Sequence, residues 1–450
     1  MDFNSSTFTK KRFINSLPKL FLPILLTGML VLIFSSRNYA IPSFARQTNL
    51  ACNYCHYAYP TLNSFGRLFK LNGYTMTNIG TIDAVSPDSS RTTLQLLSNL
   101  PISAMFIANA TSVSKKFATQ GDNNFIQAPS EMSIFLAGEI TPHLGAYIQT
   151  TYALSDGTIG LDMLDVRYAN HTKIASNDLL YGVTLNNRPT VQDVWNTTEA
   201  WGFPYVGSEA APSPSVSVMG ISEGVVGIGA YALYNELIYA ELSVYHASPS
   251  GVGYPPDNTW APNVKGLAPY WRLALQHQWK DQYLSVGTFG LSSLVYQAGI
   301  TGPTNDGTNF GFDVQYEKNL ENSSSFIFHA AYEMAKITQD PQNINNLKGL
   351  RTDLTYNFPE YISLSAGYFS ITGDNLITLV PMGNAISSAN GLPDSNGEIF
   401  QLTFIPWMNT QFALQYTIYN KFNGSSNNYD GNGRNAADNN TLNLSAWLVL

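Results

Sequence analysis

The chain has 450 residues, of which only 12% are charged and 13% are aromatic, and its formal net charge is −8. The charged fraction is about half that of an average soluble protein, and the acidic excess argues against a nucleic-acid partner. Beyond residue 40 the sequence has no apolar run long enough for a membrane-spanning helix. Few charges and many aromatic residues without such a helix are typical of a membrane β-barrel, in which apolar and polar side chains alternate.

Residues 1–40 predict an export signal that is removed from the mature protein. A basic region that ends at Lys19 precedes an apolar core over residues 20–34, and we expect cleavage after Ala40. The alternative, a retained membrane anchor, is disfavoured by the shortness of the apolar core. Without this segment, which carries a net charge of +4, the chain has a net charge of −12. Such a charge either attracts cations or merely keeps loops soluble, and the sequence leaves both interpretations open.

The segment Cys52-Asn53-Tyr54-Cys55-His56 has the C-x-x-C-H spacing that attaches a c-type haem. The two thiols bond to the vinyl groups of one porphyrin, and the histidine becomes the proximal ligand of the iron. A redox dithiol lacks the thioredoxin-like βαβ context here, and a structural zinc site lacks a second cysteine pair. A disulfide across two residues would be strained. The motif therefore predicts one covalently bound haem c, held by Cys52 and Cys55, with His56 on the iron.

The predicted haem module spans residues 41–85 and is mainly helical. We expect a short helix over 51–59 and a second helix over 62–71, whose apolar residues recur with helical spacing. A module of this size cannot enclose a haem in its own core, so it should pack on another surface. Met76 is the predicted distal iron ligand, with a plain linker methionine as the alternative, and Met105 and Met132 are weaker candidates.

From about residue 94 the sequence alternates apolar and polar residues with period two, as half-buried strands do. There are 16 or 17 such segments, one of them near residue 218, and the last runs to the C-terminus. Because single-chain bacterial barrels have even strand numbers, we expect a 16-stranded transmembrane antiparallel β-barrel over residues 94–450. No blade-length repeat supports a propeller, and a soluble sandwich would not explain the low charge.

The connections between these segments differ in length. The aromatic-rich stretch 186–214 either folds into the lumen or contributes to an interfacial aromatic belt. We expect short periplasmic turns at 141–143, 280–281 and 359–360, and long extracellular loops at 186–214, 247–265, 373–396 and 421–438.

The N-terminal motifs together resemble the fused monohaem cytochrome–porins of bacterial outer membranes, which include the iron oxidases of iron-oxidising bacteria. The resemblance is specific over about 36 residues and is architectural over the barrel. It implies one haem in or under a 16-stranded barrel, held by Cys52 and Cys55 and ligated by His56. The matching positions are Ile41-Pro42, Phe44-Ala45-Arg46, the C-x-x-C-H segment, Leu62-Asn63, Phe65-Gly66 and Asn72-Gly73-Tyr74.

Three functions compete at this point. The favoured one is an outer-membrane electron carrier, surrounded by outer-membrane lipid, with extracellular Fe(II) as the leading donor and a periplasmic c-type cytochrome or another acceptor as partner. The alternative is a substrate-selective porin whose haem is structural or regulatory. A haem enzyme or sensor would need a vacant distal site with an acid–base residue nearby. The sequence leaves the donor, the redox potential and the depth of the haem in the lumen open.

Overall fold

The computed structural model describes residues 42–450 except 78, 86–91, 117–121, 154–156, 190–192, 199–201, 209, 215–223, 249–262, 298, 341–342, 360 and 376–387. The predicted signal at 1–40 and the candidate strand near residue 218 lie outside the described residues. The described residues belong to one compact unit, Ala40–Leu450.

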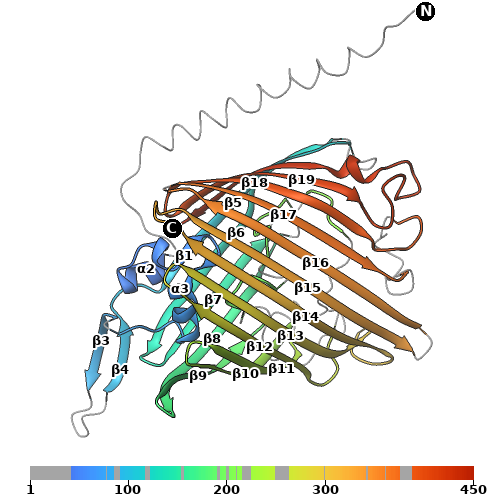
Figure 1. The fold of residues 1–450 in the computed structure, drawn as a ribbon. Coiled ribbons are helices and arrows are strands. Elements are labelled where there is room, and N and C mark those ends of the chain that lie inside the picture. Colours follow the sequence, from blue (N-terminus) through green and yellow to red (C-terminus); the bar gives the residue numbers. More distant parts are fainter. Residues whose placement is uncertain are drawn as a thin grey trace, which may run out of the picture. The chain divides into compact units, whose positions relative to one another are not determined.

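Sixteen antiparallel strands close into one barrel, in which β20 pairs with β5, and this confirms the predicted fold class (Figure 1). The closure pairs every strand of the barrel sheet on both sides. A short 3-10 helix, η5 (Ala436–Asn439), precedes the last strand. The barrel strands are β5 (Ile102–Val113), β6 (Asn124–Thr141), β7 (Leu144–Ala153), β8 (Thr158–Ile174), β9 (Asn177–Asn186), β10 (Val225–Tyr234), β11 (Ile238–Ala247), β12 (Ala268–Gln278), β13 (Gln282–Tyr296), β14 (Thr304–Asn319), β15 (Ser325–Asp340), β16 (Asn343–Asn357), β17 (Ile362–Gly373), β18 (Ser395–Trp407), β19 (Thr410–Lys421) and β20 (Thr441–Val449).

The two faces of each strand differ, as the period-two pattern predicts. In β15, Ile327, His329 and Ala331 are buried on the lumenal side, and Tyr332 is exposed on the other face. Large apolar side chains exposed on the strands form the outer surface, which suits contact with lipid. They include Ile134, Leu136, Val183, Leu185, Ile228, Leu242, Leu273, Leu275, Val286, Phe312, Leu350, Leu354, Leu364, Phe400, Leu402 and Phe404.

The two ends of the barrel have connections of different length. Strands β6 and β7, β12 and β13, and β18 and β19 are joined by short turns at the end where β5 begins and β20 finishes. The predicted short links at 141–143 and 280–281 lie there, and the long connections, including 187–224, lie at the other end. Outer-membrane-type barrels have short periplasmic turns and longer extracellular loops. We therefore call these the short-turn end and the long-loop end.

The N-terminal segment is less helical than the sequence predicted. The helix expected over 51–59 is wrong: the motif makes a single 3-10 turn and then a strand, because His56 pairs with Leu62. The helix expected over 62–71 is present and begins two residues later, where the Asn63 side chain accepts a hydrogen bond from the Gly66 amide at 3.0 Å. The elements are α2 (Pro42–Thr48), η1 (Cys52–Tyr54), β1 (His56–Ala58), β2 (Thr61–Leu62) and α3 (Ser64–Leu71).

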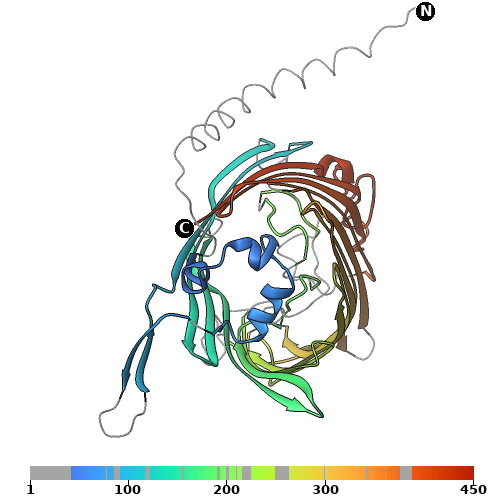
Figure 2. The same ribbon diagram turned by 60° about the vertical axis from the view of Figure 1, so that its left-hand side comes forward.

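The N-terminal segment lies inside the ring of strands at the short-turn end (Figure 2). A separate two-stranded hairpin, β3 (Thr81–Val85) and β4 (Thr92–Leu97), follows it and projects outside the barrel. The first barrel strand begins at Ile102, whereas the sequence placed the start of the barrel at residue 94. Among the described residues, no helix is long and apolar enough to span a membrane.

Candidate functional site

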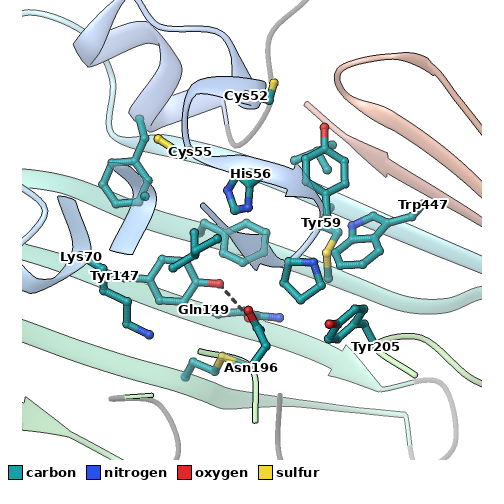
Figure 3. Close-up of a pocket in the computed structure, with 18 of the residues that line it drawn as sticks. Cys52, Cys55, His56, Tyr59, Lys70, Tyr147, Gln149, Asn196, Tyr205 and Trp447 are labelled. Atoms are coloured by element: carbon teal, nitrogen blue, oxygen red, sulfur yellow. Dashed lines mark hydrogen bonds between the residues drawn. The ribbon is translucent and has the colours of Figure 1, made fainter. Parts of the chain in front are cut away.

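Cys52, Cys55 and His56 line one cavity of about 360 Å³ in the barrel lumen, which we call the motif cavity (Figure 3). This volume is within the range of about 300–1,000 Å³ that is usual for cofactor sites. Cys52 and Cys55 are not joined in a disulfide. Burial, followed by the proximity of Cys52, raises the pKa of Cys55 to about 11, whereas redox dithiols depend on a lowered pKa.

The wall of the motif cavity is largely apolar and aromatic, which suits a porphyrin ring. Phe65 in α3 remains 40% exposed although it belongs to the apolar face of the helix, because that face borders the cavity. Barrel strands complete the wall from the opposite side. The aromatic lining consists of Phe44, Tyr59, Phe65, Phe69, Tyr74, Phe135, Tyr147, Tyr205 and Trp447.

The opposite side of the motif cavity is polar. In Figure 3, Lys70, Tyr147, Gln149 and Asn196 lie across the space from His56. Lys70 Nζ donates to the backbone oxygen of Asp193 at 3.1 Å, and burial, followed by the positive charge of Arg167, lowers the pKa of Lys70 to about 8. The cavity therefore offers an apolar enclosure with polar groups at one end.

His56 has the properties of an iron ligand. Its Nδ1 atom is buried and has no hydrogen-bond partner among the described residues. Burial lowers the pKa of His56 to about 4, although backbone groups of Pro60 and Thr61 oppose this shift. The ring is therefore neutral near neutral pH, which is the form that binds metal. The cysteine pair, the neutral imidazole and the aromatic wall fit a covalently attached haem.

Gly66 lets α3 pack directly on the haem motif. A Cβ atom at Gly66 would lie 2.3 Å from the carbonyl oxygen of Cys55 and 3.0 Å from the Leu62 side chain. No other residue could occupy this position without moving the backbone of the motif. In the Phe65-Gly66 pair, Phe65 thus lines the cavity and Gly66 allows the close contact with the motif.

The structure does not bring Met76 to the motif cavity. Glu139 accepts a hydrogen bond from the backbone of Met76, and Met76 is not among the described residues that line the cavity. Met132 is 46% exposed and does not line it either. Met105 and Met163 are the methionines that do, on β5 and β8. Met163, Asp165 and Arg167 are alternate residues of β8 and point into the lumen. The period-two pattern of the sequence could therefore have indicated that Met163 faces inward.

A buried ion pair fastens α3 to the barrel wall. Arg67 forms an ion pair with Glu317 of β14, and the two side chains are 3% and 1% exposed. Tyr57 donates a hydrogen bond to Glu317 Oε2 at 2.8 Å, and Arg67 also donates to the Leu62 carbonyl at 2.8 Å. Glu317 thus receives hydrogen bonds from both sides of the haem motif.

A second anchor holds the turn after α3. Tyr74 donates to Asp165 Oδ2 at 2.6 Å, and Arg167 Nε donates to the same atom at 2.7 Å. The turn approaches β7 so closely that a Cβ atom at Gly145 would lie 2.2 Å from the carbonyl oxygen of Gly73. The module is therefore fitted to the barrel wall at backbone level.

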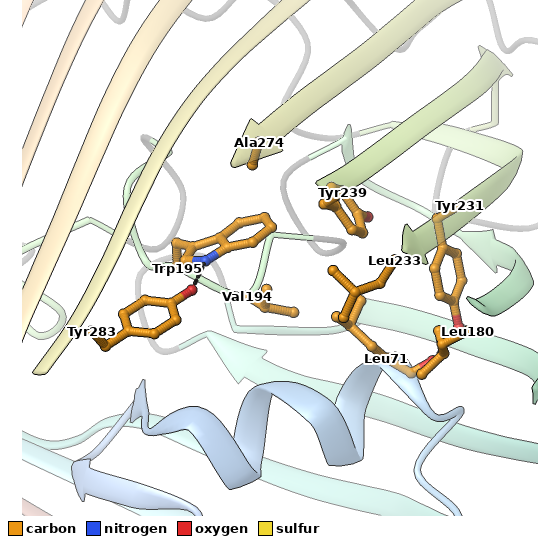
Figure 4. Packing of buried hydrophobic residues seen from close by; sticks show 9 residues of the cluster. All are labelled: Leu71, Leu180, Val194, Trp195, Tyr231, Leu233, Tyr239, Ala274 and Tyr283. Carbon is orange, nitrogen blue, oxygen red and sulfur yellow. Dashed lines mark hydrogen bonds between the residues drawn. The ribbon is translucent and has the colours of Figure 1, made fainter. Parts of the chain in front are cut away.

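Residues 193–198, in the aromatic-rich stretch 186–214, fold into the lumen, and for Trp195 this decides between the two placements predicted for that stretch. Trp195 is 1% exposed, and its Nε1 donates to the hydroxyl of Tyr283 at 2.7 Å. The Arg272 guanidinium lies 4.6 Å from the centre of the indole. Figure 4 shows this indole above α3, in a cluster that also contains Leu71. Trp201, the other tryptophan of this stretch, lies outside the described residues.

Sequence reasoning missed these anchors, because Glu317, Asp165 and Tyr283 are ordinary lumenal residues in the alternating pattern. Over the part of the chain that the structure describes, no group of three or more His, Cys, Asp or Glu side chains could hold a metal ion.

No protein-family model matches the sequence, and no curated protein matches it significantly. Among solved structures, the chain is similar to a loop-deletion variant of OmpT from Vibrio cholerae, at 13% identity and a TM-score of 0.44 over 78% of this chain and 98% of that chain. The chain is also similar to DcaP of Acinetobacter baumannii, at 13% identity and a TM-score of 0.44 over 78% of this chain and 96% of that chain. It is similar to Salmonella typhi OmpF in complex with daunomycin at 10% identity and a TM-score of 0.43, over 78% of this chain and 97% of that chain. At these TM-scores we base no argument on the likeness. The chain's own strand order defines its class, a porin-like β-barrel of the outer-membrane type.

Proposed function

We propose that the protein is a c-type cytochrome of the bacterial outer membrane, which carries electrons through one covalently bound haem in the lumen of its barrel. The observation that carries this proposal is the position of Cys52, Cys55 and His56 around a single apolar cavity. A bound haem supplies one-electron oxidation and reduction. The outward apolar surface of the strands suits outer-membrane lipid.

The chain's own residues would attach, orient and shield the cofactor. Cys52 and Cys55 would hold the haem through thioether links, and His56 would supply an imidazole ligand to its iron. The aromatic wall excludes water, which favours electron transfer over reactions with solvent. The ion pair of Arg67 with Glu317 holds the motif at a fixed depth, because both partners are buried in the docked state.

The position of the motif favours a periplasmic electron acceptor. Val449 and Trp447 line the motif cavity at the finish of β20, which lies at the short-turn end. Short turns face the periplasm in barrels of this class. A periplasmic c-type cytochrome or a similar acceptor would approach this end, and an extracellular donor, with Fe(II) as the leading candidate, would enter from the other.

The second candidate is a substrate-selective porin whose haem is structural or regulatory. The polar lumenal face and the porin-like architecture favour it. Against it, α3 and the segment around Trp195 lie inside the lumen, where they narrow any solute path. Ion conductance in planar bilayers separates the two, since an open channel would support the porin and a closed one the electron carrier.

The direct test is a visible spectrum of the oxidised, detergent-purified protein, titrated anaerobically with Fe(II) and then with dithionite. Reduction by Fe(II) would support the iron-oxidising function. Reduction by dithionite alone would leave an electron carrier with another donor. A Cys52→Ser/Cys55→Ser variant is the matched control and should release its haem into acidified organic solvent. The absence of a c-type spectrum in the unmodified protein would refute the proposal.

A further inference from the structure

A small polar cavity lies beside the motif cavity, and we call it the histidine cavity because His329 lines it. Its volume is about 20 Å³, which leaves room for one water molecule. Tyr59 and Tyr205 line both cavities and so form a shared wall. The ring of Tyr59 also contacts the ring of His56, with centroids 5.8 Å apart. A charge in the histidine cavity would therefore lie close to the motif.

His329 of β15 is held by a carboxylate on the neighbouring strand. Its ring nitrogen Nδ1 lies 3.0 Å from Asp353 Oδ2 on β16, and the two side chains are 4% and 8% exposed. A carboxylate accepts hydrogen bonds, so this contact favours the neutral ring that carries its hydrogen on Nδ1. The other ring nitrogen, Nε2, then has a free lone pair. It is buried and has no hydrogen-bond partner among the described residues.

A second buried polar atom of the histidine cavity is also unpaired. Gln411, near the start of β19, lines the cavity, and its Oε1 atom has no hydrogen-bond partner in the part of the chain that the structure describes. Leaving a buried polar atom unpaired costs about 1–3 kcal/mol. Two such atoms around a space of this size indicate a site for a water molecule or a proton carried by one.

We propose that His329 and Asp353 form a proton-binding site that takes up one proton when the haem is reduced by one electron. This inference rests on the proposed function. The electron passes from the donor to the ferric iron. The proton passes from a hydronium ion to His329 Nε2, so that one O–H bond breaks and one N–H bond forms. The total charge inside the lumen is then the same before and after reduction.

The charges around His329 favour this exchange. The pair of His329 with Asp353 is neutral overall only when the ring is protonated. Added negative charge in a buried site of low dielectric strengthens proton binding by a nearby base. The charged and titratable groups around the ring are Asp353 and Arg351 of β16, Glu317 of β14, Asp193 and Tyr205 of the connection between β9 and β10, and Tyr57 and Tyr59 of the haem module.

The other two carboxylates of this set already face arginine side chains. Glu317 forms an ion pair with Arg67, and Asp193 lies 3.6 Å from Arg272. An arginine keeps its proton at all physiological pH values, so these pairs cannot exchange a proton with the solvent through their cation. Histidine is the side chain whose charge ordinarily changes between about pH 5 and 8. The pair that contains His329 is therefore the one suited to proton uptake.

Polar side chains connect the histidine cavity with the short-turn end. Ser363 Oγ donates to Asn357 Oδ1 at 2.6 Å, and Asn357 Nδ2 donates to Ser325 Oγ at 2.8 Å. Asn357 and Ser363 both line the cavity. Ser325 begins β15, Asn357 ends β16 and Ser363 is the second residue of β17, so all three lie at the short-turn end. A proton therefore has a polar route between the cavity and the periplasmic side.

The test measures the midpoint reduction potential of the purified haem-loaded protein between about pH 5 and 8. In the unmodified protein the potential should fall by about 59 mV as the pH rises, which corresponds to about tenfold tighter proton binding in the reduced state. His329→Gln should abolish this fall, because the amide cannot take up the proton. His171→Gln is the matched control and should retain the fall, since His171 also lies 3.0 Å from an aspartate, Asp178, but that pair is about half exposed.

Asp353→Asn distinguishes a proton site from a merely structural role. Loss of the carboxylate weakens proton binding in both redox states, so the fall in potential should move to lower pH rather than vanish. Deuterium exchange at the ring carbon Cε1, followed by mass spectrometry, reports the protonation of His329 directly. Its half-protonation point should be about one pH unit higher in the reduced protein than in the oxidised protein.

Three results would overturn the inference: a potential that does not depend on pH in the unmodified protein, a fall that persists in His329→Gln, or equal half-protonation points in the two redox states. If His329→Gln does not retain haem, the exchange measurement on the unmodified protein decides. Failure of the proposed function is distinct, because the unmodified protein would then lack a reducible c-type spectrum.

Discussion

Replacing Glu317 with leucine should release the haem motif from the barrel wall while the barrel stays folded. Glu317 is the carboxylate partner of Arg67 and accepts a hydrogen bond from Tyr57 at 2.8 Å. Removing one member of a buried ion pair costs about 3–5 kcal/mol, because the other charge remains buried without its partner. Arg67 would keep its hydrogen bonds to Leu62 and Ser64 in the same segment and its contact with the Tyr283 ring, whose centre lies 3.9 Å from the guanidinium carbon. The equilibrium constant for docking of the N-terminal module on the barrel wall should therefore fall by about a hundredfold or more.

Hydrogen exchange of peptides that cover residues 56–71 measures this loss, since local opening exposes their amides. Exchange should accelerate in Glu317→Leu and return toward the original rate in the triple variant Tyr57→Phe/Arg67→Met/Glu317→Leu, which removes the Tyr57 hydroxyl and leaves neither charge of the pair buried alone. Lys421→Met breaks the more exposed pair with Asp394, 2.8 Å long, and should change stability by at most about 1 kcal/mol. Unchanged exchange in Glu317→Leu, or a triple variant as labile as the single one, would refute the reasoning.

Three further outcomes are expected. His56→Ala should abolish or weaken haem retention while the barrel still assembles. The control His277→Ala, at an exposed position, should retain the haem. Loss of barrel assembly in His56→Ala would mean that haem binding is part of barrel folding. Met76→Leu should leave the absorption spectrum and reduction potential unchanged, because Met76 does not line the cavity, and loss of a sulfur–iron charge-transfer band would contradict this. Gly145→Val should destabilise docking of the module by about 1–3 kcal/mol through overpacking against Gly73, seen as faster exchange of residues 72–77; normal exchange would show that the turn can shift.

The barrel could be predicted from sequence because its strands obey a local rule. Successive side chains of each strand point alternately to the lipid and to the lumen. The orientation of residues such as Ile327 and His329 can therefore be predicted from their neighbours in sequence alone. The even-number rule for closure then selected 16 strands from 16 or 17 candidates. His329 lies on the lumenal face by this rule, and its ring nitrogen Nδ1 lies 3.0 Å from Asp353 Oδ2.

The haem module obeys no such rule, because its conformation depends on distant partners. The helix expected over 51–59 fails since residues 56–62 pair as strands around the chain reversal at Pro60. Arg67 looks like a solvated cation near a helix end, but its partner Glu317 is 250 residues away in sequence. Met76 has a suitable spacing from the motif, yet the turn at Gly73 directs it toward Glu139. The conformation at each of these positions depends on contacts with residues that are distant in the sequence, most of them on the barrel wall.

The buried ion pairs explain why a module too small to enclose a haem can dock inside this barrel. In an apolar core, burying Arg67 and Glu317 would cost several kcal/mol for each ion, and Coulomb attraction would only partly offset it. The lumen of an outer-membrane-type barrel is lined with polar side chains, and Gln315 and Tyr57 donate further hydrogen bonds to the Glu317 carboxylate. These hydrogen bonds lower the free-energy cost of burying the two charges. The geometry of the ion pair then fixes how deep in the lumen the N-terminal module lies and which part of β14 it contacts. The barrel thus supplies the second half of a cavity wall that the short N-terminal module could not form alone.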